Sequence, residues 1–346
     1  MLSFIWTTSL ALSILSILVM TLLIVRRMLT TGRDRRNAES RKRVMTAMIR
    51  LTHDEDVEAF LQTVRGAHPA VIADASSEFL DLVRGGERDV VLAALDRSGQ
   101  PAFLQKELQR GNEVRRLQAV ELLAAYPTQM ARPALQERLD RDRSREVRLA
   151  AALELAKIGA VPKLDRLLTR IGYRGQRSGR LAELFRLLPD DSEPQLKMLA
   201  RDGGAPVFLR ASALEALWRR DGLVEPSIFA DMADDAAPEV AAAALRALGR
   251  VAHRPSLDLV TSKLAHPDWE VRMEAADAVG RLGDPAAAPL LGALLDDEQW
   301  TVRYRAAQSL RQLGAAGLQM LSSMARETPS RRQRTASMVL SEGLPA

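Results

Sequence analysis

The 346-residue sequence contains no cysteine, which excludes disulfide frameworks, thiolate metal sites and cysteine nucleophiles. A cysteine-free chain tolerates either redox environment, so this absence leaves the compartment open. Aromatic residues make up only 4% of the chain, and strand-like runs of Val, Ile and Thr are scarce. Hydrophobic residues nevertheless reach 47%, with Ala and Leu abundant. This composition predicts an all-α protein with a large core, in one elongated domain or in two to three compact ones.

The motifs of common catalytic and nucleotide-binding families are also missing. The sequence has no HExxH, GxSxG, Walker A or GxGxxG element, and its four histidines are scattered. Acidic residues fall mainly at predicted helix starts, where the helix dipole favours negative charge. We therefore expect a protein that is not an enzyme and that holds no cofactor or metal.

Positive charge is concentrated in one short segment. Residues 1–25 carry no charged side chain, whereas residues 26–50 hold nine Lys and Arg against Asp34 and Glu39, a net charge of +7. The whole chain has 49 Lys and Arg against 44 Asp and Glu, so residues 51–346 have 40 against 42, a net charge of −2. Because nucleic-acid binding depends on clustered cations, this balance argues against a nucleic-acid partner.

The uncharged N-terminus predicts a membrane anchor. The stretch from Phe4 to Val25 is mostly apolar, and 22 residues of helix span about 33 Å, enough to cross a hydrocarbon core of about 30 Å. A cleaved signal peptide would need a basic start, a shorter apolar run and a small-residue cleavage site. Arg26 and Arg27 stand where that site should be, so we expect one uncleaved transmembrane helix within residues 1–25.

The charges that flank this helix predict its orientation. They follow the apolar run, so the positive-inside rule places the N-terminus outside and the rest of the chain in the cytoplasm. Arg outnumbers Lys 43 to 6 and Ala is abundant, which indicates a GC-rich bacterial genome and hence the bacterial inner membrane. The basic juxtamembrane segment, residues 26–50, serves as a topology signal or, over residues 26–43, contacts anionic headgroups. The candidate headgroup contacts are Arg26, Arg27, Arg33, Arg35 and Arg36.

A motif of about 31 residues recurs along the rest of the chain. In its clearest copy an apolar stripe follows the helical period up to Gly283, and Asp284 and Pro285 then start a second helix. One helix pair alone leaves an apolar face uncovered, so the pairs must stack into an α-solenoid of about seven or more pairs. Copies align on Val114, Val147, Val207, Val240, Val271 and Val302, with a degenerate copy around Gly179.

The motif D-x-x-V-R-x-x-A-A-x-A-[LV]-G-x-L-G-D, present from Asp268 to Asp284, resembles HEAT repeats, specifically the short type named for phycobilisome lyases. The resemblance covers residues 110–322 and implies a rigid solenoid with a concave binding face, which we expect the second helices to line. Residues 51–110 are then a helical N-terminal cap. Residues 111–346 hold the repeats and a C-terminal cap helix over 330–344.

Two places in this array are candidate partner-binding sites. Trp269 and Trp300 share one register, and Trp dominates many interfaces; alternatively, each indole packs over the preceding turn. The glycine-rich basic loop over residues 171–181 either grips an anionic surface or is a simple connector. Its candidate residues are Tyr173, Arg174, Arg177 and Arg180.

A further recurrent residue is the arginine that follows the aligned valine. As a ladder these arginines would form an anion-binding stripe or, as balanced charge favours, pair with Asp or Glu of their own or an adjacent repeat, such as Asp268 or Glu298. The aligned arginines are Arg115, Arg148, Arg272 and Arg303.

Together these features predict a membrane-tethered scaffold or adaptor that binds a protein partner at the cytoplasmic face of the membrane. By analogy, it would be a subunit of envelope or polysaccharide machinery. The alternative is a lyase-like or other ligand-binding HEAT protein with enzymatic activity, and a third hypothesis is nucleic-acid binding. The paired His-Glu motifs of the di-iron hydroxylases built on similar repeats are absent, because no histidine here is followed by Glu.

Overall fold

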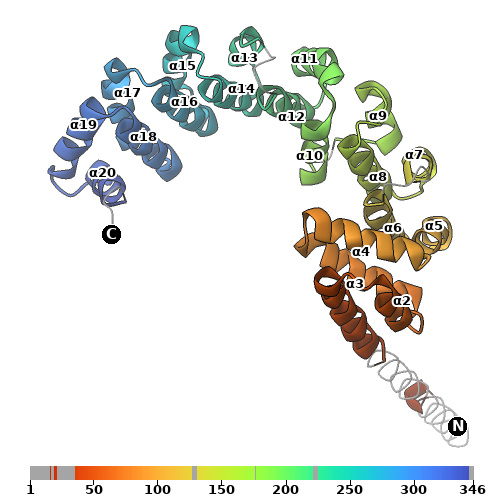
Figure 1. Cartoon of the computed structure of the whole chain (residues 1–346). Helices are drawn as coiled ribbons and strands as arrows, with labels where there is room; N and C mark the ends of the chain where they lie inside the picture. Colours follow the sequence, from red (N-terminus) through yellow and green to blue (C-terminus); the bar gives the residue numbers. More distant parts are fainter. Residues whose placement is uncertain are drawn as a thin grey trace, which may run out of the picture. The chain divides into compact units, whose positions relative to one another are not determined.

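The computed structural model describes residues 16, 19–21, 36–126, 131–175, 177–220 and 225–342. Helices dominate this part of the chain, and no β-strand occurs within it, which confirms the all-α class. The chain divides into two compact units, Met1–Glu154 and Leu155–Ala346, here called unit 1 and unit 2. Figure 1 labels the helices of both units.

The predicted transmembrane helix lies outside the described residues except for residues 16 and 19–21. Arg26, Arg27, Arg33 and Arg35 also lie outside them, whereas Arg36 is exposed and is the first described residue of a helix that the structure describes over residues 36–54. Within the described ranges, no helix is both long enough and apolar enough to cross a membrane. The anchor therefore stays a prediction.

Unit 1 begins with the helix over residues 36–54, which buries Val44, Met48 and Leu51. These side chains lie four and three residues apart, so one apolar face of a basic segment joins the core. Asp56 and Asn112 cap later helices by accepting hydrogen bonds from backbone N–H groups of the first turn. The helices that follow are α2 (Val57–Val64), α3 (Pro69–Leu82), α4 (Gly85–Arg97), α5 (Gln100–Arg110), α6 (Glu113–Ala124), α7 (Ala131–Arg141) and the start of α8 (Arg145–Lys157).

Unit 2 continues the alternation of first and second helices that starts at α6. Three second helices begin or end in 3₁₀ turns, which are η1 (Asp190–Ser192), η2 (Arg254–Ser256), η3 (Lys263–Ala265), η4 (Pro285–Ala287) and η5 (Leu294–Asp296). The helices are α9 (Leu164–Ile171), α10 (Gly179–Leu187), α11 (Glu193–Arg201), α12 (Val207–Trp218), α13 (Ser227–Met232), α14 (Pro238–Arg250), α15 (Leu257–Ser262), α16 (Trp269–Leu282), α17 (Ala288–Ala293), α18 (Trp300–Gln312), α19 (Ala315–Ala325) and α20 (Arg331–Ser341).

In the clearest repeat the first helix ends and the second helix begins at the predicted residues. The side chain of Asp268 caps α16, and Gly283 ends that helix with φ +72°, a left-handed conformation that favours glycine. The carboxylate of Asp284 then accepts a hydrogen bond from the N–H of Ala286, and Pro285 opens η4. The second helix therefore starts with a 3₁₀ turn before α17, a detail that the apolar pattern alone does not predict.

Small residues bring the first helices of unit 2 close together. A Cβ atom on Gly249 of α14 would lie 2.8 Å from the Cα atom of Ala278 in α16, and one on Gly280 of α16 would lie 2.8 Å from the Cα atom of Ser309 in α18. Figure 1 shows α12, α14, α16 and α18 in a row on the inner side of the curve of unit 2, with α13, α15 and α17 outside. The expectation that second helices line the concave face is therefore wrong for this unit, because the side of closest helix approach becomes the inner side.

The last helix of the described residues is α20, which packs against α18 and α19. It buries Thr335, Ala336 and Val339 and is capped by the hydroxyl of Ser330, which accepts from the N–H of Gln333. Within the stretch 330–344, where a C-terminal cap helix is predicted, the structure describes a helix over Arg331–Ser341.

Candidate partner-binding surfaces

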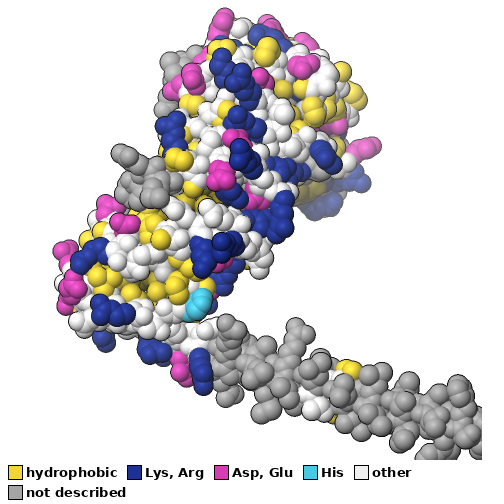
Figure 2. Space-filling view, turned by 90° about the vertical axis from the view of Figure 1, so that its right-hand side faces the viewer, with side chains coloured by type: hydrophobic (Ala, Val, Ile, Leu, Met, Phe, Trp, Pro, Cys, Tyr) yellow, Lys and Arg dark blue, Asp and Glu magenta, His cyan; other side chains and the backbone are white. Residues whose placement is uncertain are grey.

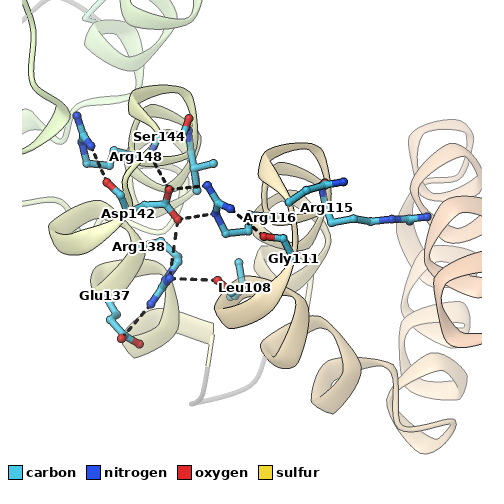
Figure 3. A network of polar contacts seen from close by, with 11 residues as sticks. Leu108, Gly111, Arg115, Arg116, Glu137, Arg138, Asp142, Ser144 and Arg148 are labelled. Carbon is cyan, nitrogen blue, oxygen red and sulfur yellow. Dashed lines mark hydrogen bonds and ion pairs between the residues drawn. The ribbon is translucent and has the colours of Figure 1, made fainter.

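The recurrent arginines are bound into a structural ladder between repeats. In three first helices the fourth residue is an arginine that pairs with an aspartate just before the next first helix; these ladder arginines are Arg116, Arg210 and Arg272. Arg148 and Arg303, the fourth residues of α8 and α18, donate to backbone carbonyls just before their own helices. In unit 1 the Arg116 Nε and Asp142 Oδ2 atoms are 2.9 Å apart, and the two side chains are only 5% and 1% exposed. The same carboxylate accepts from the N–H of Ser144, and the Asp142 carbonyl accepts from Arg148 (Figure 3).

Unit 2 repeats this arrangement twice. Arg210 pairs with Asp235 through both guanidinium Nη atoms, and the Arg272 Nε atom lies 2.7 Å from Asp297 Oδ2. Hydrogen bonding to Asp297 raises the pKa of Arg272. Burial on its own would raise the pKa of Asp297, but the hydrogen bonds from Arg272 and from the N–H of Gln299 hold that pKa below its usual range. The ladder thus stabilises the junctions between repeats.

Two copies of the repeat are in a different register from the one predicted. Val114 and Val207 are 72% and 38% exposed, so neither occupies the buried place of the aligned valine. In α12 that place belongs to Leu209, two residues further along, and the ladder residue is Arg210. In α6 the ladder residue is Arg116, and the predicted Arg115 instead pairs with Asp74 of α3 at 2.6 Å.

The tryptophan pair, here called the tryptophan rim, lies at the starts of adjacent first helices. Trp269 is the first residue of α16 and is 36% exposed; Trp300 is the first residue of α18 and is 53% exposed. The ring of Trp300 stacks on that of Tyr304 one turn later, with centroids 5.1 Å apart and an angle of 11° between the ring planes. A stacked, half-exposed indole offers a rigid apolar contact to a partner.

The basic loop between α9 and α10 is anchored to the repeat array on one side. Arg174 and Arg177 are exposed and Tyr173 is half-buried, whereas Arg180, also exposed, lies in the first turn of α10. Arg177 forms an ion pair with Glu239 near the start of α14, which ties the loop to a first helix two repeats further along. One of the loop's charges is thereby neutralised within the chain.

Charged groups on the first helices of unit 2 are mostly matched in a similar way. Arg246 of α14 lies between Glu215 of α12 and Glu274 of α16 and forms ion pairs with both. Asp277 accepts from Arg281 in the same helix and approaches Arg305 of α18 at 3.6 Å. On the face that Figure 2 shows, Lys and Arg side chains are likewise interspersed with Asp and Glu.

Sequence reasoning overlooked one cluster, at the end of α12. The guanidinium carbon of Arg219 lies 4.5 Å from the centroid of the Trp218 indole, and that of Arg250 lies 5.6 Å from the same centroid. The Trp218 Nε1–H donates to Glu215 at 2.9 Å, which fixes the ring. The available signal was that Arg219 and Arg250 are 31 residues apart, one repeat length.

Stacked helix pairs joined by a buried Arg–Asp ladder define an α-helical repeat protein. The profile of HEAT repeats matches residues 101–183, 226–311 and 266–341, more than half of the chain. The chain belongs to the HEAT-repeat family.

Solved structures with similar folds have low sequence identity to this chain. An engineered protein is 18% identical over 88% of this chain and 94% of its own, with a TM-score of 0.36. The karyopherin Kap121p bound to the SUMO protease Ulp1p is 14% identical over 87% of this chain and 45% of its own, with a TM-score of 0.37. Human deoxyhypusine hydroxylase in complex with glycerol is 17% identical over 78% and 94%, with a TM-score of 0.30. No curated protein matches the sequence.

Proposed function

We propose that this protein is a membrane-tethered scaffold or adaptor, without enzymatic activity, whose HEAT repeats bind a protein partner. One observation carries the proposal: the ladder arginines are bound within the chain, whereas the indoles of the tryptophan rim are left 36% and 53% exposed. Exposed tryptophans on a rigid helical scaffold suit a protein interface, because large rings bury much area at little cost in side-chain entropy.

The membrane part of the proposal is supported by the sequence alone. Residues 4–25 are uncharged and residues 26–50 carry a net charge of +7, which suits a single-pass anchor with the repeats in the cytoplasm of a bacterial cell. Arg36, exposed in the helix described over residues 36–54, belongs to the basic segment proposed to contact anionic headgroups. A role in envelope or polysaccharide machinery follows by analogy only.

Capture of partners by the full-length protein, extracted in an uncharged detergent, tests the scaffold. We expect W269A/W300A to lose a partner that the wild-type protein captures. The matched control is L290A/L318A, which truncates two leucines that are 50% and 40% exposed on α17 and α19. If W269A/W300A retains every partner, the tryptophan rim is not the interface. A tetrapyrrole or nucleotide that co-purifies with the protein would instead favour the ligand-binding alternative.

Protease added to spheroplasts tests the topology separately. The repeats are expected to stay intact until the membrane is permeabilised, because the proposed orientation places them in the cytoplasm. Digestion of the repeats in intact spheroplasts would contradict that orientation while leaving the scaffold proposal standing.

A further inference from the structure

The cluster at the end of α12, here called the arginine patch, consists of Trp218, Arg219 and Arg250. Both guanidinium groups lie against one indole, at 4.5 Å and 5.6 Å from its centroid. Their carbon atoms are therefore no more than about 10 Å apart, which is about one Debye length at 0.1 M ionic strength. Two like charges are held close together by a ring whose own position is fixed by Glu215.

These two arginines share one indole and, in the part of the chain that the structure describes, lack a carboxylate partner of their own. Among the described residues, neither Arg219 nor Arg250 has an acidic group within ion-pair distance, although both are exposed. Their neighbours in the same row are matched, since Arg246 bridges Glu215 and Glu274. A cation at a helix C-terminus interacts favourably with the helix dipole, which explains one arginine at each helix end. It does not explain why two of them converge on one ring.

Contact with the indole leaves the N–H groups of both guanidinium groups available to an anion. An arginine stacked on an aromatic face keeps its N–H groups in the plane of the guanidinium, where a carboxylate can accept two of them at once. A bound carboxylate would also relieve the repulsion between the two cations. Because the ring is already oriented by the hydrogen bond from Trp218 to Glu215, little ordering is needed on binding.

We propose that the arginine patch binds an acidic segment of the protein partner, through Asp or Glu side chains that bridge Arg219 and Arg250. The inference rests on the proposed scaffold function and specifies the chemistry of the partner. A protein carboxylate fits better than nucleic acid, because Glu215, Glu274 and Asp277 lie on the same row of helices. A polyanion with a phosphate at every nucleotide would meet these carboxylates, whereas a peptide places its charges selectively.

The test measures binding of hexaglutamate carrying an uncharged dye, by fluorescence anisotropy. The full-length protein is placed in nanodiscs of phosphatidylglycerol and phosphatidylcholine, so that anionic lipid occupies the basic segment over residues 26–50. R219Q/R250Q is expected to bind the peptide at least tenfold more weakly than wild type. The matched control R331Q/R334Q removes two exposed arginines of α20 and should bind within twofold of wild type.

Melting temperatures, a third variant and control ligands distinguish loss of the binding site from loss of the fold. Both double variants should melt within a few degrees of wild type, because the substituted side chains are exposed and their contacts with the helix dipole and the indole are individually weak. W218L keeps both cations but removes the ring that positions them, and it should weaken binding severalfold. Equal binding by the two double variants, or equal binding of hexaglutamate and hexaglutamine to wild type, would overturn the proposal. So would an oligothymidylate that binds more tightly than hexaglutamate and is lost in R219Q/R250Q.

Partner capture separates this inference from the scaffold proposal. If R219Q/R250Q retains every partner that wild type captures, the arginine patch is not the acidic docking site, although the protein is still a scaffold. If wild type captures no partner at all, the scaffold proposal itself fails, whatever the peptide measurement shows.

Discussion

The contact between α16 and α18 at Gly280 allows the packing of the repeats to be tested quantitatively. An added Cβ atom would lie 2.6 Å from Ser309 Cβ and 2.8 Å from Ser309 Cα. Because Cα belongs to the backbone, the two helices must separate; rotating a side chain would not relieve the clash. Overpacking of this kind costs about 1–3 kcal/mol, against a gain of up to about 1 kcal/mol from the better helix propensity of Ala. We therefore expect G280A to lose roughly 1–2 kcal/mol of unfolding free energy.

The assay is urea unfolding of the full-length protein in an uncharged detergent, followed by far-UV circular dichroism. The control is G86A in α4, because a Cβ atom on Gly86 would meet nothing within 4 Å. G86A gains helix propensity without a clash, so its stability should equal or exceed that of wild type. Since repeat arrays often unfold in steps, the loss in G280A should fall on the transition of unit 2. A G280A protein as stable as wild type would refute the close approach of α16 and α18.

Two further predictions concern the ladder and its dependence on pH. D142A leaves the Arg116 guanidinium, 5% exposed, without its carboxylate and should cost about 3–5 kcal/mol in urea unfolding; D231A, which breaks an exposed ion pair with α11, should cost less than about 1 kcal/mol. Although burial raises it, the pKa of Asp297 is lowered overall by its hydrogen bonds with Arg272 and a backbone N–H. Its stabilising contribution is therefore fully present above the ordinary value of 3.8 and is lost as pH falls through the lower folded-state pKa. D297N should flatten this acid limb in a plot of melting temperature against pH.

The features that could be predicted from the sequence are those set by local chemistry. The stripe of Val271, Ala275 and Val279 specifies one helix, and Gly283 with Asp284 specifies its end and the next start. Family membership follows from the same stretch, because its residues recur at a fixed period. None of these inferences requires knowing how far apart successive helices lie.

The register of the weaker copies could not be predicted, because burial and not residue type determines it. An alignment on valine selects Val207, but the helix turns Leu209 inward and leaves Val207 38% exposed at its first position. At α6 the residue preceding the ladder arginine is Arg115, which faces Asp74 of a helix outside the repeat pattern. A polar partner there removes the need for an apolar residue, so the motif is blurred at the beginning of the array.

The arginine patch could not be predicted from the sequence, because it depends on how successive helices pack. Two residues one repeat apart can meet only if successive first helices are close and suitably rotated, as α12 and α14 are. Once the helices are close, every arginine on the row competes for the same few carboxylates. Arg246 forms ion pairs with two of these carboxylates, whereas Arg250, one turn later, contacts the Trp218 indole. An arginine without an ion pair, on a row where the other charges are paired, is the position where a partner's carboxylate contributes most to binding free energy.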